Sequence, residues 1–125
     1  DVMVTTDMQE RKAKMRELSD AFIALPGGFG TLEEVLEVVT LRQLSYHTKP
    51  VVLINTNNFY QHLIKQFEVS FSELFAKAIC RKLYFAAENP HEAIQYIEQH
   101  KPSELDSKWF VVPAKPNAST DKSSF

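Results

Sequence analysis

The residues best suited to chemistry lie in segment 26–31, Pro-Gly-Gly-Phe-Gly-Thr, which holds all three glycines of the chain. An apolar run precedes this segment and a helical pattern follows it. A turn between a buried strand and a helix directs free backbone N–H groups and the positive end of the helix dipole at one point, where an anion can approach glycine backbone closely. This placement favours a phosphate site. A tight connection without a ligand is the alternative, and a short glycine motif alone does not exclude it.

Glu34 has two possible roles. Thr31 and Glu34 have the spacing of a capping box, in which Thr31 is the N-cap and Glu34 bonds back to its amide. A carboxylate in the first turn beside a bound phosphate can also reach the sugar attached to that phosphate. The sequence leaves the structural and the catalytic role equally open.

Arg11 and Lys12 are cations within an apolar pattern. At about 100° per residue they share a helix face with Met8, Met15 and Leu18. Cations on such a face must reach the surface or meet a fixed anion. One interpretation pairs them with acidic residues at the rim of the core. The other, which we favour because this helix precedes the strand before the glycine turn, directs them at a phosphate or at Glu34.

Strand and helix patterns alternate along the chain. Apolar runs with strand character lie at 21–25, 51–54 and 83–86. Helical patterns lie at 8–18 with Asp7 as N-cap, at 31–46, at 59–67 with an extension over 71–79, and at 90–100 with Asn89 as N-cap. Strands that are apolar on both sides and alternate with helices predict an α/β fold, a parallel sheet with helices on both faces.

Length and composition predict one domain. The 125 residues are 44% hydrophobic, enough for a single core, which we expect over residues 1–106. Residues 107–125 become rich in Ser, Lys and Pro and predict a disordered tail. The chain starts at Asp1 without an initiator Met, so we interpret it as a fragment.

Charge and cysteine content exclude several classes of protein. With 14 basic and 16 acidic residues, the net charge of −2 offers no general attraction for nucleic acid or acidic membranes. No apolar run has the length of a membrane span, and one cysteine, Cys80, cannot form an internal disulfide. We therefore expect a cytoplasmic protein. The four scattered histidines do not suggest a metal site.

Two motifs together resemble a known family. Met-Gln-Glu-Arg-Lys at 8–12, followed by Pro-Gly-Gly-Phe-Gly-Thr-Leu-Glu-Glu at 26–34, resembles the LONELY GUY (LOG) family of cytokinin-activating phosphoribohydrolases, long mislabelled lysine decarboxylases. The likeness covers about residues 3–100. It implies a Rossmann-like fold, a homodimer, and hydrolysis of a purine riboside 5′-monophosphate, typically N6-modified, to free base and ribose 5-phosphate. We expect this reaction to need no metal or organic cofactor.

The resemblance also assigns site residues. Arg11 and Glu34 match the catalytic pair of the family. The substrate-contacting positions are matched by Arg11, Lys12, Gly28, Phe29, Gly30, Thr31, Leu32, Glu33, Glu34 and Thr40. The chain departs from the family at Gln9, where a histidine is usual, and it lacks the front half of the family with the first strands of the sheet.

Cleavage of an N-glycosidic bond develops positive charge on the ribose, which a carboxylate stabilises while it orients or deprotonates the attacking water. We assign this role to Glu34, with Arg11 keeping it ionised and fixing the phosphate or the leaving base. The alternatives are a non-catalytic nucleotide-binding module of the same fold and an inactive truncated subunit. A true decarboxylase would need pyridoxal phosphate on a buried lysine, and no lysine is marked out for that role.

Overall fold

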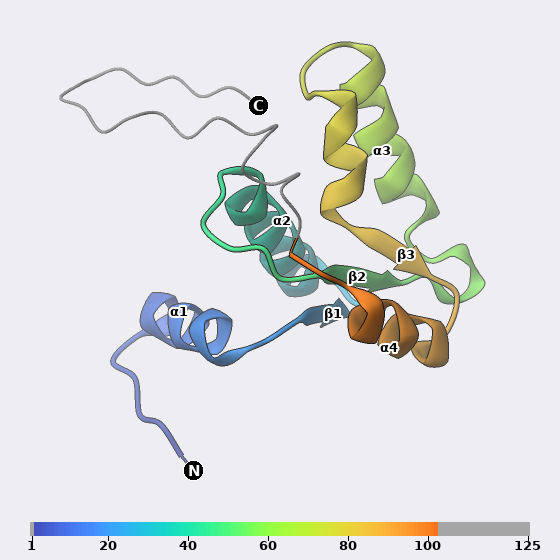
Figure 1. The fold of residues 1–125 in the computed structure, drawn as a ribbon. Helices are drawn as coiled ribbons and strands as arrows, with labels where there is room; N and C mark the ends of the chain where they lie inside the picture. The colour runs from blue at the N-terminus through green and yellow to red at the C-terminus, as the bar shows by residue number, and fades with distance from the viewer. Residues whose placement is uncertain (1, 103–125) are drawn as a thin grey trace, which may run out of the picture.

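The computed structural model describes residues 2–102, in which short strands alternate with helices (Figure 1). The strands are β1 (Phe22–Ala24), β2 (Val51–Ile54) and β3 (Phe85–Ala87). The helices are α1 (Met8–Leu18), α2 (Phe29–Gln43), α3 (Gln61–Ser72) and α4 (Pro90–Gln99), with 3-10 turns η1 (Thr56–Asn58) and η2 (Ala78–Leu83). The end of the predicted domain at residue 106 and the predicted tail at 107–125 lie outside the described residues.

The strands form one parallel sheet in the order β1-β2-β3, which confirms the predicted α/β fold. All four residues of the central strand β2 are buried. β1 differs from its prediction, because Ile23 is 43% exposed and the strand is not covered on both sides. The physical reason is its place at an edge of the sheet, since within residues 2–102 β1 pairs only with β2.

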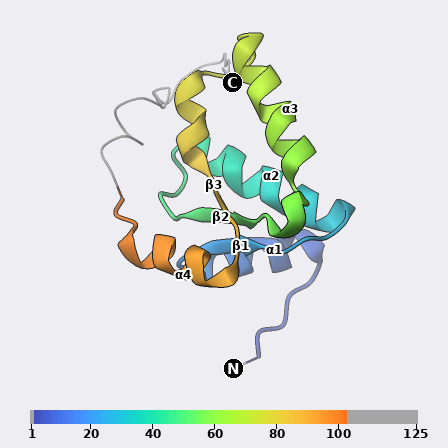
Figure 2. The same ribbon diagram turned by 90° about the vertical axis from the view of Figure 1, so that its right-hand side faces the viewer.

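Helices cover both faces of this sheet (Figures 1 and 2). Val52 and Ile54 point to one face, where they pack with Ala93 of α4. Leu53 points to the opposite face, where it packs with Val35 of α2. Successive side chains of β2 therefore point to opposite faces of the sheet and contribute to an apolar layer on each face, as expected for a buried parallel strand.

The predicted helix caps hold at two of the helices. The carboxylate of Asp7 accepts the Glu10 amide at 2.8 Å, and the Asn89 side chain accepts the Glu92 amide at 2.8 Å. The predicted helical extension over 71–79 is wrong. α3 ends at Ser72 because the chain reverses through Leu74, whose φ is 66°, and η2 then packs back on α3 (Figure 1).

Three further features describe residues 2–102. No helix there combines the length and apolar character that a membrane crossing requires. No group of three or more His, Cys, Asp or Glu side chains in this range could hold a metal ion. Cys80 is a buried free thiol in the apolar cluster between α3 and η2.

Candidate active site

The glycine turn leads directly into α2. Gly28 is the N-cap, with φ −106° and ψ −146°, and its carbonyl accepts the Leu32 amide at 3.1 Å. The predicted start at Thr31, and the capping box with Glu34, are therefore wrong. Glycine is itself an acceptable N-cap, so the helix begins before Thr31 without a side-chain bond. Glu34 is left without the structural role that competed with catalysis.

The first turn of α2 presents unused amides. The N–H groups of Phe29, Gly30 and Thr31 precede the first intrahelical bond and have no hydrogen-bond acceptor among residues 2–102. A methyl group built on Gly28 or Gly30 would meet no atom within 4 Å beyond its chain neighbours and the local backbone of the helix. One built on Gly27 would lie 2.2 Å from Oγ1 of Thr31. Gly27 is thus needed for close packing, while the other two glycines keep the helix start open to an anion.

A groove of about 700 Å³ runs between α1, β1 and the first half of α2. Its walls include Pro26 of the turn and Gly30, Thr31 and Glu34 of α2. Glu34 is exposed, and its carboxylate has no ion pair or hydrogen bond within the described residues. The groove therefore joins an uncommitted carboxylate to a helix start suited to an anion, which is the arrangement that phosphate binding beside a general base requires.

Ion pairs join α1 to α2. The Nζ of Lys12 lies 3.3 Å from Glu33 and 3.7 Å from Glu37, and Arg16 lies 3.0 Å from Glu37. Lys12 is 5% exposed, so its charge depends on these partners. Two interpretations of Lys12 were open, a pair with acidic residues at the rim of the core or a contact with phosphate or Glu34. The structure shows the first of them. Two cations meet two carboxylates, which leaves Arg11 outside this network.

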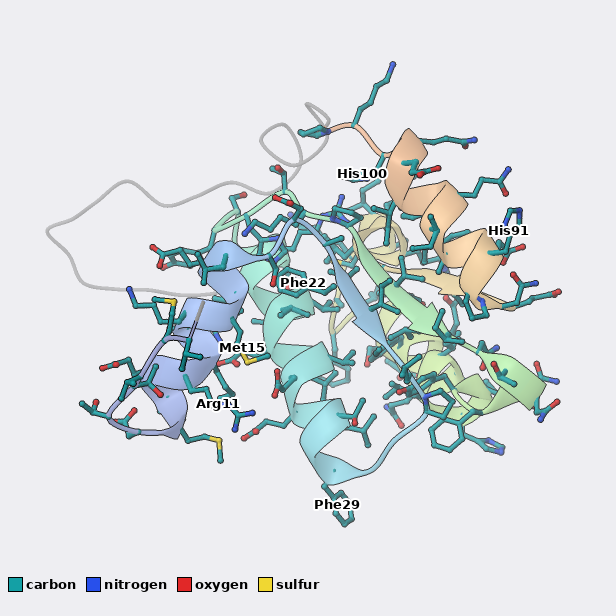
Figure 3. The ribbon with its side chains drawn as sticks, turned by 90° about the horizontal axis from the view of Figure 1, so that it is seen from below. Arg11, Met15, Phe22, Phe29, His91 and His100 are labelled. Atoms are coloured by element: carbon teal, nitrogen blue, oxygen red, sulfur yellow. The ribbon has the colours of Figure 1, made fainter. Side chains whose placement is uncertain are left out.

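Arg11 is exposed, and its side chain has no ion pair or hydrogen bond in the part of the chain that the structure describes. It does not contact Glu34. The Lys12–Glu33 ion pair nevertheless holds this part of α1 beside the first turns of α2. Figure 3 shows Arg11 nearer than Met15 to the tip of α2 that carries Phe29. Arg11 is not among the residues that line the Glu34 groove, so the part of the chain that the structure describes does not join the predicted catalytic pair.

The apolar face predicted for α1 is not a core face. Met8 is 62% exposed, Met15 is 50% exposed and Leu18 is 66% exposed, so only Lys12 on this face is buried. The reason is that α1 is held to α2 through charged side chains, beside the edge strand β1 rather than over the sheet (Figure 3).

The other residues predicted to contact the substrate lie in different places in the structure. Phe29 projects from the tip of α2 and is 92% exposed (Figure 3). Leu32 packs in the core, and its amide is already bonded to Gly28. Thr40 lies about 120° around the helix from Glu34 and lines a separate groove of about 270 Å³ between α2, α3 and η2. A single chain therefore does not bring Thr40 to the Glu34 groove.

Tyr60 is the site residue that the sequence pattern did not reveal. Its hydroxyl donates to the Leu25 carbonyl at 2.5 Å, directly before the glycine turn. Burial raises the pKa of the Tyr60 hydroxyl above its usual value, so the group stays a neutral donor. The only signal in the sequence is an aromatic pair that follows the asparagine-rich turn after β2.

The parallel sheet, with a glycine turn at the carboxyl end of a strand opening a helix, defines a Rossmann-like α/β protein with an anion-binding helix start. The chain belongs to the family described as possible lysine decarboxylase, whose family model matches residues 1–97.

Curated relatives carry the name that the motifs suggested. The chain is 47% identical over 100 residues to the probable cytokinin riboside 5′-monophosphate phosphoribohydrolase LOGL1 of Oryza sativa subsp. japonica, covering 80% of this chain and 45% of that protein. It is 42% identical over 110 residues to the cytokinin riboside 5′-monophosphate phosphoribohydrolase LOG7 of Arabidopsis thaliana. This match covers 86% of this chain and 51% of that protein. The chain thus spans about half the length of these relatives.

Proposed function

We propose that the whole protein hydrolyses the N-glycosidic bond of a purine riboside 5′-monophosphate and releases the free base and ribose 5-phosphate. The observation that carries this proposal is the shared groove, which holds the uncommitted Glu34 carboxylate and the open first turn of α2. The relatives at 47% and 42% identity, named as phosphoribohydrolases of cytokinin riboside 5′-monophosphates, support the reaction and a cytokinin-type base as its product.

In this mechanism the amides of Phe29, Gly30 and Thr31 bind the 5′-phosphate. The ribose then lies along the first turns of α2, within reach of Glu34. As the C1′–N bond breaks, Glu34 stabilises the positive charge on the sugar and takes a proton from the water that bonds to C1′. The electron pair of the broken bond leaves with the base, whose nitrogen gains a proton. No metal or organic cofactor takes part in this scheme.

The charge on Arg11 is assigned to the substrate phosphate or to the leaving base. Arg11 is the cation of α1 that forms no ion pair within residues 2–102, and guanidinium is well suited to phosphate. We propose that the remaining matched positions contact the substrate in the whole protein, with additional elements completing the site: Lys12, Gly28, Leu32, Glu33 and Thr40.

A nucleotide-binding module without catalysis is the second candidate. The observation that favours it is the lack of contact between Arg11 and Glu34 within residues 2–102. A binding module needs the glycine turn but no carboxylate beside the phosphate. Release of free base by the purified whole protein therefore separates the two candidates.

The first prediction concerns the substrate phosphate. Whole protein should cleave a purine riboside 5′-monophosphate with a kcat/KM roughly tenfold to hundredfold above that for the nucleoside, because the nucleoside leaves the charge-binding amides of α2 unused. Chromatography of the released base from both substrates measures this ratio. Equal values for the two substrates would contradict the phosphate site.

Gly28→Ala supplies a matched control for that experiment. The new methyl group meets no atom within 4 Å beyond the chain neighbours, and alanine in place of a glycine N-cap should cost at most about 1 kcal/mol, so the fold should survive with a somewhat lower melting temperature. The methyl group would stand where the anion approaches the turn, and it should therefore raise KM for the nucleotide and leave the weak nucleoside activity unaffected. Loss of both activities in parallel would place the substrate elsewhere.

The second prediction concerns assembly, and we propose a homodimer. Leu36 of α2 is 43% exposed and Leu44, the C-cap residue of this helix, is 38% exposed, which leaves apolar surface that a second copy can bury. Sedimentation of the whole protein at micromolar concentration should show a dimer, and Leu36→Glu should shift it toward monomer. A monomeric parent protein would contradict this prediction.

We propose the reducing cytoplasm as the location of the protein, and the buried free thiol of Cys80 is compatible with it.

A further inference from the structure

Tyr60 occupies a fixed place beneath the start of α2. The residue is 2% exposed and packs in one apolar cluster with Val35 of α2 and Leu53 of β2. The Phe59 ring meets the Tyr60 ring edge-on, with centroids 5.0 Å apart. A ring enclosed in this way cannot swing out, so the direction of its hydroxyl is set by packing.

Hydrogen bonds through Tyr60 link the carboxyl ends of all three strands. The Tyr60 hydroxyl donates at 2.5 Å to the carbonyl of Leu25, the residue after β1. The Tyr60 amide donates at 2.7 Å to Oδ1 of Asn55, the residue after β2. The Asn55 amide in turn donates at 2.7 Å to the carbonyl of Ala87, the last residue of β3. The glycine turn is thereby tied to the other two strand ends.

The asparagine-rich turn after β2 makes this arrangement possible. Asn57 and Asn58 have φ values of 53° and 59°, in the left-handed region that asparagine tolerates better than most residues. Two successive left-handed residues reverse the chain between Asn55 and Tyr60. The Tyr60 amide consequently returns to the Asn55 side chain, and its ring returns under the glycine turn.

We propose that Tyr60 is a positioning residue for phosphate binding, because its hydroxyl fixes the Leu25 carbonyl from which the glycine turn departs. The inference rests on the proposed phosphate site. The turn is held at both ends, by the Tyr60 bond to Leu25 and by the bond from Leu32 to Gly28. Between these ends Pro26 has a restricted φ. The first amides of α2 are thus aimed before a ligand arrives.

Tyr60 acts through the turn and not on the substrate. Its hydroxyl hydrogen is committed to Leu25, and the ring is enclosed in the core. Glu34 lies on α2, beyond the turn, and the neighbouring Val35 keeps its contact with the ring when only the Tyr60 hydroxyl is removed. Loss of the Tyr60 hydroxyl should therefore loosen phosphate binding and leave the chemical step nearly unchanged.

The test is Tyr60→Phe in the whole protein. KM for the nucleotide should rise roughly threefold to tenfold, the value of one buried hydrogen bond, while kcat changes by less than about twofold. Inhibition by inorganic phosphate should weaken by the same factor as KM rises. Hydrogen exchange should be faster than in the parent protein at the amide of Leu32, whose bond to the Gly28 carbonyl closes the turn. Asn55→Ala, which removes the acceptor of the Tyr60 amide, should act in the same direction and replaces Tyr60→Phe if that variant fails to fold.

Tyr84→Phe is the matched control. Tyr84 packs against the same apolar cluster, but its ring contacts the Phe67 ring at a tilt, with centroids 5.2 Å apart, and no hydrogen bond joins it to the glycine turn within the described residues. The Tyr84→Phe substitution should leave KM and the exchange of the Leu32 amide unchanged. A Tyr60→Phe enzyme with parental KM and exchange would overturn the inference, although the phosphate preference of the parent would stand. If the parent itself ignores the phosphate, the proposed function fails, while the exchange measurement still decides whether Tyr60 holds the turn.

Discussion

Glu34→Gln in the whole protein should lower kcat by roughly two to four orders of magnitude, the scale of a lost general base or charge stabiliser. Glutamine keeps the size of the side chain and removes the negative charge that the developing sugar cation needs. Nucleotide binding should survive, because the first-turn amides of α2 are backbone groups. The measurement is kcat and KM with a purine riboside 5′-monophosphate, together with the melting temperature.

The structure makes this substitution informative, because Glu34 has no structural bond to lose. It does not cap α2, whose N-cap is Gly28, and it forms no ion pair within residues 2–102. Its melting temperature should therefore match that of the parent. A Glu34→Gln protein with near-normal kcat would exclude the catalytic role and leave a nucleotide-binding module as the better description.

Glu37→Gln is the control for charge on the same helix. Glu37 lies one turn further along α2 and pairs with Lys12 at 3.7 Å and Arg16 at 3.0 Å. Its loss should cost roughly 1 to 3 kcal/mol of folding free energy, since Glu37 is partly exposed but the buried Lys12 would keep only Glu33 as its partner. The kcat should change little. Substitution of the two neighbouring carboxylates is thus expected to affect different quantities. Glu37→Gln should lower the stability of the fold, and Glu34→Gln should lower kcat.

The sequence predicted the local elements well where a chemical signal marks them. Asp7 and Asn89 cap the helices that follow them, and the four apolar residues of 51–54 form the buried central strand. The end of α3 carries no comparable signal, since Leu74 has φ 66° without a glycine or asparagine. The exposure of β1 could not be read from its composition either, because an edge strand and a central strand can be equally apolar.

The site was predicted in part, for related reasons. The glycine turn and Glu34 were recognisable from local spacing, and they share one groove. The partner of Lys12 could not be recognised in the same way, because a phosphate or the two carboxylates of Glu33 and Glu37 can neutralise a buried cation equally well. Thr31 was misread as the N-cap because Thr–Glu spacing fits a capping box even when Gly28 starts the helix. Tyr60 depends on contacts between separate elements, which no local pattern contains.

Arg11→Ala should lower kcat/KM by roughly two to three orders of magnitude, by weakening both nucleotide binding and turnover. The reason is that Arg11 is exposed, lies nearer than Met15 to the Phe29 tip of α2 (Figure 3), and is not used by the ion pairs that hold α1 to α2. Its removal should accordingly leave the melting temperature almost unchanged.

Two further variants on α1 show whether the loss at Arg11 is specific. Lys14→Ala removes an exposed cation whose only partner among the described residues is Glu17, 3.6 Å away, and it should leave kcat/KM unchanged. Arg11→Lys keeps the charge but not the planar fork, so it should recover only part of the activity. Equal losses at Lys14 and Arg11 would indicate a general effect of positive charge. Parental kcat and KM in Arg11→Ala would remove Arg11 from the site and leave Glu34 to act without it.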